Sequence, residues 1–90
     1  MLTREAVIVN ESGFHIRPAQ LFTEQAAKFT SKISIAVKGT NTVADGKSIL
    51  GLMTLGLAKG SEIVISAEGA DEQEAIDALA ELVQSGFGEA

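Results

Sequence analysis

The sequence predicts a small α+β protein in which a four-stranded antiparallel sheet is covered on one face by three helices. Strand and helix patterns follow one another along the chain in the order β-α-β-β-α-β-α. The strand patterns have one apolar and one mixed face, which is typical of an antiparallel sheet with helices on one side. No internal repeat or linker interrupts the 90 residues, so we expect a single domain over residues 1–90.

Three strands and one helix are expected in the N-terminal half of the chain. The strand segments are rich in β-branched or alternating apolar residues, and turn-forming residues follow them. Pro18 suits the first turn of a helix, where its missing N–H group is not needed, and apolar residues recur after it at helical spacing. The expected ranges are strands over about 3–10, 33–37 and 42–44 and a helix over about 16–28.

Two helices and one strand are expected in the C-terminal half. Ser48 has a side chain suited to cap the first of these helices, which we expect to end at Gly60. Alternating apolar residues predict a strand over 63–67. Asp71 opens an Asp-x-x-Glu capping box, which predicts the start of a last helix that ends near Gly86.

The helix after Ser48 is apolar on nearly all sides. A chain of 90 residues cannot easily bury every side, and exposed apolar surface usually marks a contact surface. Helical spacing places Ile49, Leu50 and Met53 on one side, which we expect to be exposed, although complete burial of the helix is the alternative. The residues expected in the core are Leu52, Leu55 and Leu57.

Composition and charge exclude several classes of protein. Without cysteine the chain has no disulfide, iron–sulfur site or thiol nucleophile, and its one histidine lacks the carboxylates needed for a metal site. The net charge is −5, with all seven basic residues in residues 1–60, so an acidic protein suits that part better than nucleic acid does. Because no apolar run reaches the roughly 20 residues that span a bilayer, and no secretory signal begins the chain, we expect a cytoplasmic protein with no membrane contact and no cofactor.

Candidate chemistry is concentrated at His15 and Ser48. His15 stands before the helix that Pro18 helps to start, and a helix N-terminus favours anions. Arg17 adds a planar guanidinium that can pair with phosphate oxygens. His15 is therefore either a nucleophile beside a phosphoryl site or a surface histidine near a cap. Ser48 is either a plain N-cap or a phosphorylation site, and composition does not choose between them.

Two segments of the chain resemble known signatures. The segment Gly13-Phe14-His15-Ile16-Arg17-Pro18-Ala19 resembles the active-site motif of HPr, the histidine-containing phosphocarrier family of the phosphoenolpyruvate-dependent sugar phosphotransferase system. The segment from Lys47 to Gly60 resembles that family's second signature, around its regulatory serine. The resemblance covers the whole chain, although Ile16 replaces the small residue or threonine that is common at its position.

The resemblance implies an open-faced β-sandwich with strand order 1-4-2-3. His15 would accept a phosphoryl group on Nδ1 from phosphorylated enzyme I and pass it to IIA domains of sugar permeases, while Arg17 would stabilise the phosphohistidine. Ser48 would match the serine that HPr kinase/phosphorylase modifies, which would add a transcriptional regulator to the partners. The chain would be a monomeric carrier rather than an independent enzyme. Its partner surface would comprise Ile16, Gln20, Leu21, Ile49, Leu50 and Met53.

Other readings of the same chain make different predictions. A nitrogen-branch carrier uses a similar histidine motif, whereas the Lys-Ser-Ile context around Ser48 favours the sugar branch or a dual role. A small-molecule-binding regulatory domain would dimerise through the apolar patch and leave His15 without a role. An independent enzyme is the poorest alternative, because Arg17 is the one candidate for a second catalytic group near His15. Incubation with phosphoenolpyruvate and enzyme I separates a carrier from a regulatory domain.

Overall fold

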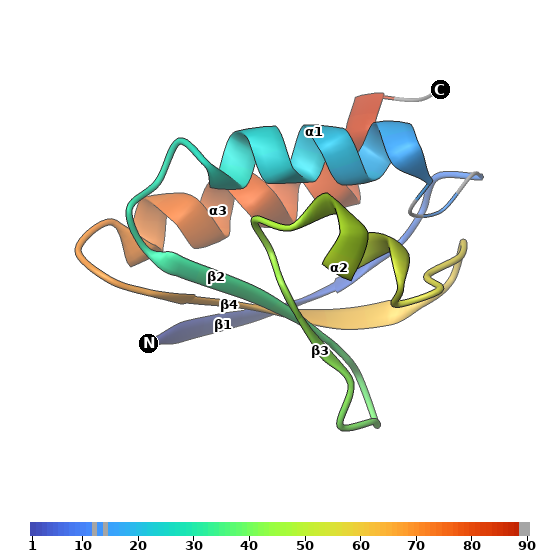
Figure 1. Ribbon diagram of the computed structural model, residues 1–90, viewed down its shortest axis with the longest axis horizontal. Coiled ribbons are helices and arrows are strands. Elements are labelled where there is room, and N and C mark those ends of the chain that lie inside the picture. The colour runs from blue at the N-terminus through green and yellow to red at the C-terminus, as the bar shows by residue number, and fades with distance from the viewer. Residues whose placement is uncertain (12, 14, 89–90) are drawn as a thin grey trace.

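Four strands form one antiparallel sheet in the order β1-β4-β2-β3, and three helices cover one of its faces (Figure 1). This computed structural model describes residues 1–11, 13 and 15–88. It confirms both the predicted element order and the predicted strand order. The elements are β1 (Leu2–Val7), α1 (Ile16–Ala26), β2 (Lys32–Val37), β3 (Val43–Asp45), α2 (Ile49–Met53), β4 (Glu62–Glu68), α3 (Glu72–Gln84) and a short 3-10 turn, η1 (Gly86–Gly88).

The strand order brings two distant parts of the chain together. β4 lies between β1 and β2 and pairs antiparallel with both, so that Ile65 is opposite Arg4 on one side and Ile35 on the other. At the end of β1, Val7 is opposite Glu62, the first residue of β4. The segment after β1, which leads to His15, therefore starts beside the segment that precedes β4.

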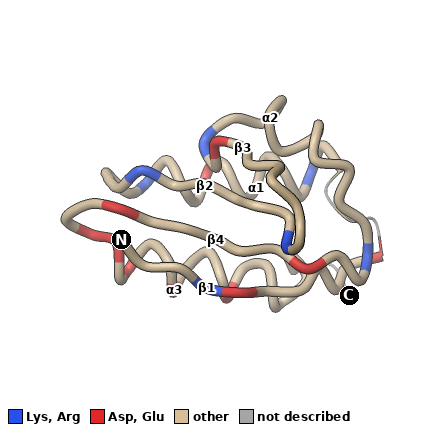
Figure 2. Tube along the Cα trace, turned by 90° about the horizontal axis from the view of Figure 1, so that it is seen from below, with Lys and Arg blue, Asp and Glu red and all other residues tan. Residues whose placement is uncertain are grey.

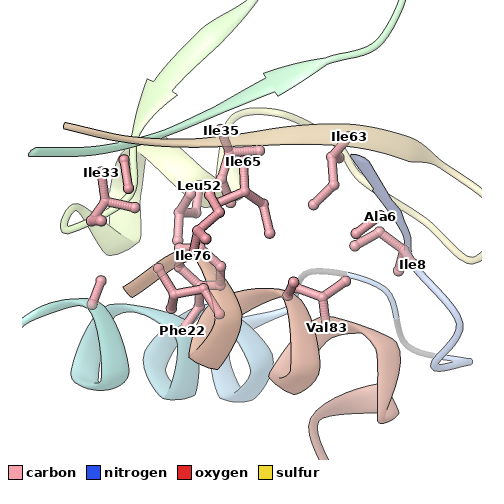
Figure 3. Packing of buried hydrophobic residues seen from close by; sticks show 14 of the residues in the cluster. Ala6, Ile8, Phe22, Ile33, Ile35, Leu52, Ile63, Ile65, Ile76 and Val83 are labelled. Carbon is pink, nitrogen blue, oxygen red and sulfur yellow. The ribbon is translucent and has the colours of Figure 1, made fainter. Parts of the chain in front are cut away.

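The core lies between the sheet and the helices (Figure 3). Alternate residues of the strands point inward, as Ile63 and Ile65 of β4 do, into the same buried cluster that holds Phe22 of α1 and Ile76 of α3. Leu52 of α2 is also fully buried. Each such side chain contributes about 1.5–3 kcal/mol when it leaves water, so this layer holds the three helices on the sheet.

Two elements end earlier than predicted. β1 ends at Val7 rather than near residue 10, although Ile8 still donates its N–H to the Ser61 carbonyl. α2 ends at Met53 rather than at Gly60, because the chain tightens there into three-residue turns such as Leu55 N–H to Leu52 O. Of the three leucines expected in the core, Leu52 and Leu57 are buried as predicted, whereas Leu55 is half-buried against the core.

The predicted capping box at the start of α3 is wrong for Asp71. Its carboxylate does not cap α3 but accepts hydrogen bonds from the backbone N–H groups of Thr30 and Ser31, each at 2.9 Å, and from the Ser31 hydroxyl. The hydroxyl of Ser31, followed by the Thr30 N–H, lowers the pKa of Asp71 to about 2. Asp71 therefore joins the connection between α1 and β2 to the start of α3.

Acidic residues gather at the turn between β4 and α3, close to the N-terminus (Figure 2). The amino group of Met1 lies 3.4 Å from the Glu72 carboxylate, and Arg4 of β1 pairs with Asp77 of α3 at 2.6 Å. These contacts tie β1 to α3 at the edge of the sheet. Among the described residues, no helix is long and apolar enough to cross a membrane.

Candidate functional site

His15 occupies the N-cap position of α1 with an exposed side chain. Its backbone is extended, and its carbonyl accepts the N–H of Ala19 at 3.0 Å, which begins the helix. The imidazole itself makes no capping hydrogen bond. The histidine side chain is thus accessible from solvent beside the N–H groups of the first helical turn, which have no partner within the helix.

Arg17 is the second residue of α1 and is also exposed. Within the part of the chain that the structure describes, Arg17 has no acidic partner, whereas Arg4, Lys38 and Lys59 each form an ion pair. Its guanidinium is therefore available to an anion held at the start of the same helix.

The helices α1 and α2 pack against each other (Figure 1). Both carry exposed apolar side chains. The exposed fractions are 65% for Ile16, 41% for Ile49, 75% for Leu50 and 39% for Met53. This confirms the predicted exposure of the three α2 residues. On α1, Gln20 is exposed and Leu21 is half-buried against the core, so the two helices together present a mixed apolar and polar surface.

Ser48 is the N-cap of α2, as predicted. Its hydroxyl oxygen accepts the N–H of Gly51 at 3.1 Å, and its side chain is half-buried. The neighbouring Lys47 donates from Nζ to the Phe29 carbonyl at 2.8 Å, which anchors the start of α2 to the end of the α1 region. Ser48 therefore stands beside Ile49 and Leu50 at a fixed place on the apolar surface.

A contact that sequence reasoning missed joins the approach to His15 to the segment before β4. Glu11 and Lys59 form an ion pair at 2.6 Å, and the Gly60 N–H donates to the Ile8 carbonyl at 2.7 Å. The predicted adjacency of the first and fourth strands is the one sequence signal that could have found it. Ile8 and Glu11, which precede His15 in the chain, thus contact Gly60 and Lys59 of the segment before β4.

The site is an exposed helix end rather than an enclosed pocket. A surface cavity of about 230 Å³ at the edge of β1 is lined by Glu5, Ala6, Val7, Val9, Glu62 and Gln84, and His15 does not line it. No group of three metal-ligating side chains occurs among the residues described. An open site of this kind suits exchange with another macromolecule.

Comparison with known proteins identifies the family. The family model described as "PTS HPr component phosphorylation site" matches residues 2–85. The chain belongs to the HPr family. The phosphocarrier protein HPr of Cupriavidus necator is 39% identical over 89 residues, which cover 99% of this chain and 98% of that protein.

Solved HPr structures agree with this assignment. A crystal structure of HPr-C-His from Thermoanaerobacter tengcongensis has a TM-score of 0.92 and 43% sequence identity, covering 100% of this chain and 99% of that one. An HPr dimer from the same organism has a TM-score of 0.77 and 48% identity, covering 91% and 92% of the two chains. HPr proteins are phosphocarriers of the phosphotransferase system, so the family supports that role over a small-molecule-binding regulatory domain or an independent enzyme.

Proposed function

We propose that this HPr-family protein carries a phosphoryl group on Nδ1 of His15. It receives the group from phosphorylated enzyme I and passes it to IIA domains of sugar permeases. The observation that supports the proposal is the exposed imidazole at the N-cap of α1, which makes no capping hydrogen bond of its own. We expect the exchange to take place in the cytoplasm, with the protein as a monomer and no cofactor.

The proposed transfer follows from the groups at the start of α1. The lone pair of Nδ1 attacks the phosphorus atom, the bond between phosphorus and the donor breaks, and its electron pair returns to the donor. The free N–H groups of the first helical turn attract the anionic phosphoryl group. The Arg17 guanidinium pairs with the phosphoryl oxygens and so stabilises the phosphohistidine form of His15.

The same surface would dock both partners. Ile16 adjoins His15, and the exposed residues of α2 lie on the helix that packs against α1. Burial of apolar side chains supplies affinity, while the nearby cation Arg17 favours an acidic partner. The proposed docking surface consists of Ile16, Gln20, Leu21, Ile49, Leu50 and Met53.

Ser48 is the proposed regulatory site. A phosphoryl group from HPr kinase/phosphorylase would put a charge of about −2 beside Ile49 and Leu50. Docking of enzyme I beside Ser48 would then require the phosphoryl group to lose its hydration water, which opposes binding. The modified surface would instead suit a partner that offers basic groups, such as a transcriptional regulator.

Labelling with phosphoenolpyruvate and catalytic enzyme I tests the proposed function. We expect one acid-labile phosphate per chain in the wild type and none in His15→Ala, whose circular dichroism should match the wild type because the side chain is exposed. Label that persists in His15→Ala, or no label in the wild type, would contradict the assignment. Transfer from labelled protein to sugar-specific rather than nitrogen-branch IIA domains then identifies the branch.

A further inference from the structure

We propose that Gly13 is a positioning residue for His15, because it allows the 54–61 segment to support the turn before the histidine. This inference rests on the proposed function and names the part of the fold that holds the imidazole in place for transfer. Gly13 and the 54–61 segment neither accept the phosphoryl group nor belong to the proposed docking surface.

Two hydrogen bonds join Asn10 to Gly13, which stands two residues before His15 in the chain. The Gly13 N–H donates to the Asn10 carbonyl at 3.2 Å, and the Asn10 side chain donates from Nδ2 to the Gly13 carbonyl at 2.8 Å. Both Asn10 and Gly13 are buried. Only one residue separates Gly13 from His15, the N-cap of α1, so we expect a displacement of Gly13 to displace His15.

Gly13 lies against backbone rather than against side chains. A Cβ atom at this position would be 2.5 Å from the Leu57 carbonyl oxygen and 2.8 Å from the Ala58 Cα, closer than real Cβ atoms approach other atoms. Its φ of +63° also belongs to the left-handed region that glycine adopts without cost. Because backbone cannot rotate aside as a side chain can, any larger residue would push the turn away from the 54–61 segment.

The 54–61 segment is itself held in place. Leu57 is buried in the core, and the Ala58 N–H donates to the Ser61 hydroxyl at 3.1 Å. The ion pair between Lys59 and Glu11 links the segment to the turn from a second side. This segment continues directly from α2, so the chain that supports the turn before His15 follows the helix that carries part of the docking surface.

Replacement of Gly13 by alanine should therefore affect transfer more than docking. Misplacement of a reacting group by about 1 Å can cost roughly 100-fold in rate. For Gly13→Ala we expect kcat for phosphorylation by enzyme I to fall about tenfold or more, with KM for this protein changed less than about threefold, because α1 and α2 keep their surfaces.

Gly39→Ala is the matched control for backbone strain. Gly39 has a φ of +82° in the connection between β2 and β3, and a Cβ atom there would meet nothing within 4 Å. This variant has the same kind of left-handed strain as Gly13→Ala but no clash. We expect it to lower the melting temperature while leaving kcat at the wild-type value.

A charge exchange tests the same support without changing any glycine. Glu11→Lys places two cations together, so it should lower kcat severalfold. The double variant Glu11→Lys with Lys59→Glu restores an ion pair between the same positions and should recover most of that loss. The double variant has the same net charge as the wild type. Any effect of net charge on the encounter with enzyme I is therefore absent from the double variant.

The outcomes distinguish this inference from the proposed function. A folded Gly13→Ala with wild-type kcat, a loss no larger than that of Gly39→Ala, or a change confined to KM would overturn the positioning role. If Gly13→Ala does not fold, the charge variants decide. The positioning role is then overturned if Glu11→Lys, the double variant and the wild type all have the same kcat. A wild type that accepts no phosphate overturns both proposals, whereas normal labelling with unaffected variants overturns this one alone.

Discussion

At the scale of single residues, Arg17 is the group whose removal should separate folding from transfer. Because its side chain is exposed and has no acidic partner among the described residues, Arg17→Ala should change the free energy of unfolding by less than about 0.5 kcal/mol. Phosphoryl transfer to a IIA domain should nevertheless slow, and Arg17→Lys should be intermediate because an ammonium cannot pair with two oxygens in the same plane. Rapid-quench kinetics measure this effect.

Lys28→Ala is the matched control, because it removes an exposed cation just beyond the other end of α1. It should leave the transfer rate unchanged. Equal slowing by Lys28→Ala and Arg17→Ala would assign the effect to net charge rather than to pairing with the phosphoryl group.

Ser48 is expected to act both as a cap and as a switch. Ser48→Ala removes the oxygen that accepts the Gly51 N–H and should destabilise the protein by about 1 kcal/mol. Ser48→Asp keeps an acceptor, so it should fold normally yet slow phosphorylation of His15 by enzyme I. The phosphoserine form should act more strongly because its charge is larger. Equal enzyme I rates for the unmodified, Ser48→Asp and phosphoserine forms would leave Ser48 as an N-cap alone.

At the scale of elements, α2 divides its residues between the core and the proposed docking surface. Leu52 is fully buried, so Leu52→Ala should destabilise the protein by about 2–5 kcal/mol. Met53 is exposed, so Met53→Glu should weaken binding to enzyme I while changing stability little. Chemical denaturation and titration calorimetry measure the two effects. A Met53→Glu variant that unfolds, or one that binds normally, would contradict this division.

The connection between α1 and β2 depends on α3 through Asp71, and this dependence should be visible in acid. The pKa of Asp71 is lowered from 3.8 to about 2 by hydrogen bonds from Ser31 and Thr30. Its contribution to stability is therefore complete above the unfolded pKa and is lost as the pH falls through the folded pKa. Urea unfolding of the wild type and of Asp71→Asn between pH 5 and pH 2 gives the free energy of unfolding of each as a function of pH. We expect the difference between the two free energies to shrink as the pH falls. A difference in free energy of unfolding that stays constant over this pH range would contradict the expectation.

At the scale of the whole molecule, we expect one chain of 9.4 kDa in solution. β1 pairs with β4 over six residues and is tied to α3 by the contacts of Met1 with Glu72 and of Arg4 with Asp77. Release of β1 to a second copy would break these contacts within the chain and re-form the same contacts between two chains, so the dimer would gain no pairing of β1 that the monomer lacks. Light scattering coupled to size exclusion should give the monomer mass over a range of concentrations, and a mass that rises toward twice that value would contradict the prediction.

The sequence by itself determined the features that depend on neighbouring residues. Period-two and helical patterns, together with turn and cap residues, predicted the four strands and the three α-helices in order but not the short η1. Each of these signals reports on neighbouring residues within its own element. The cap at Ser48 and the exposure of Ile49, Leu50 and Met53 were predictable for the same reason. The two motifs around His15 and Ser48 were sufficient to indicate the HPr family, which the comparisons confirm.

The tertiary structure decided the features in which residues far apart in the chain meet. Asp71 has the spacing of a cap for α3, yet its carboxylate binds the backbone 40 residues earlier, because the fold places unpaired N–H groups there. The contact of Gly13 with the 54–61 segment exists because β1 and β4 are neighbours in the sheet. No local pattern encodes either contact, since each depends on the packing of two elements whose separation along the chain is large.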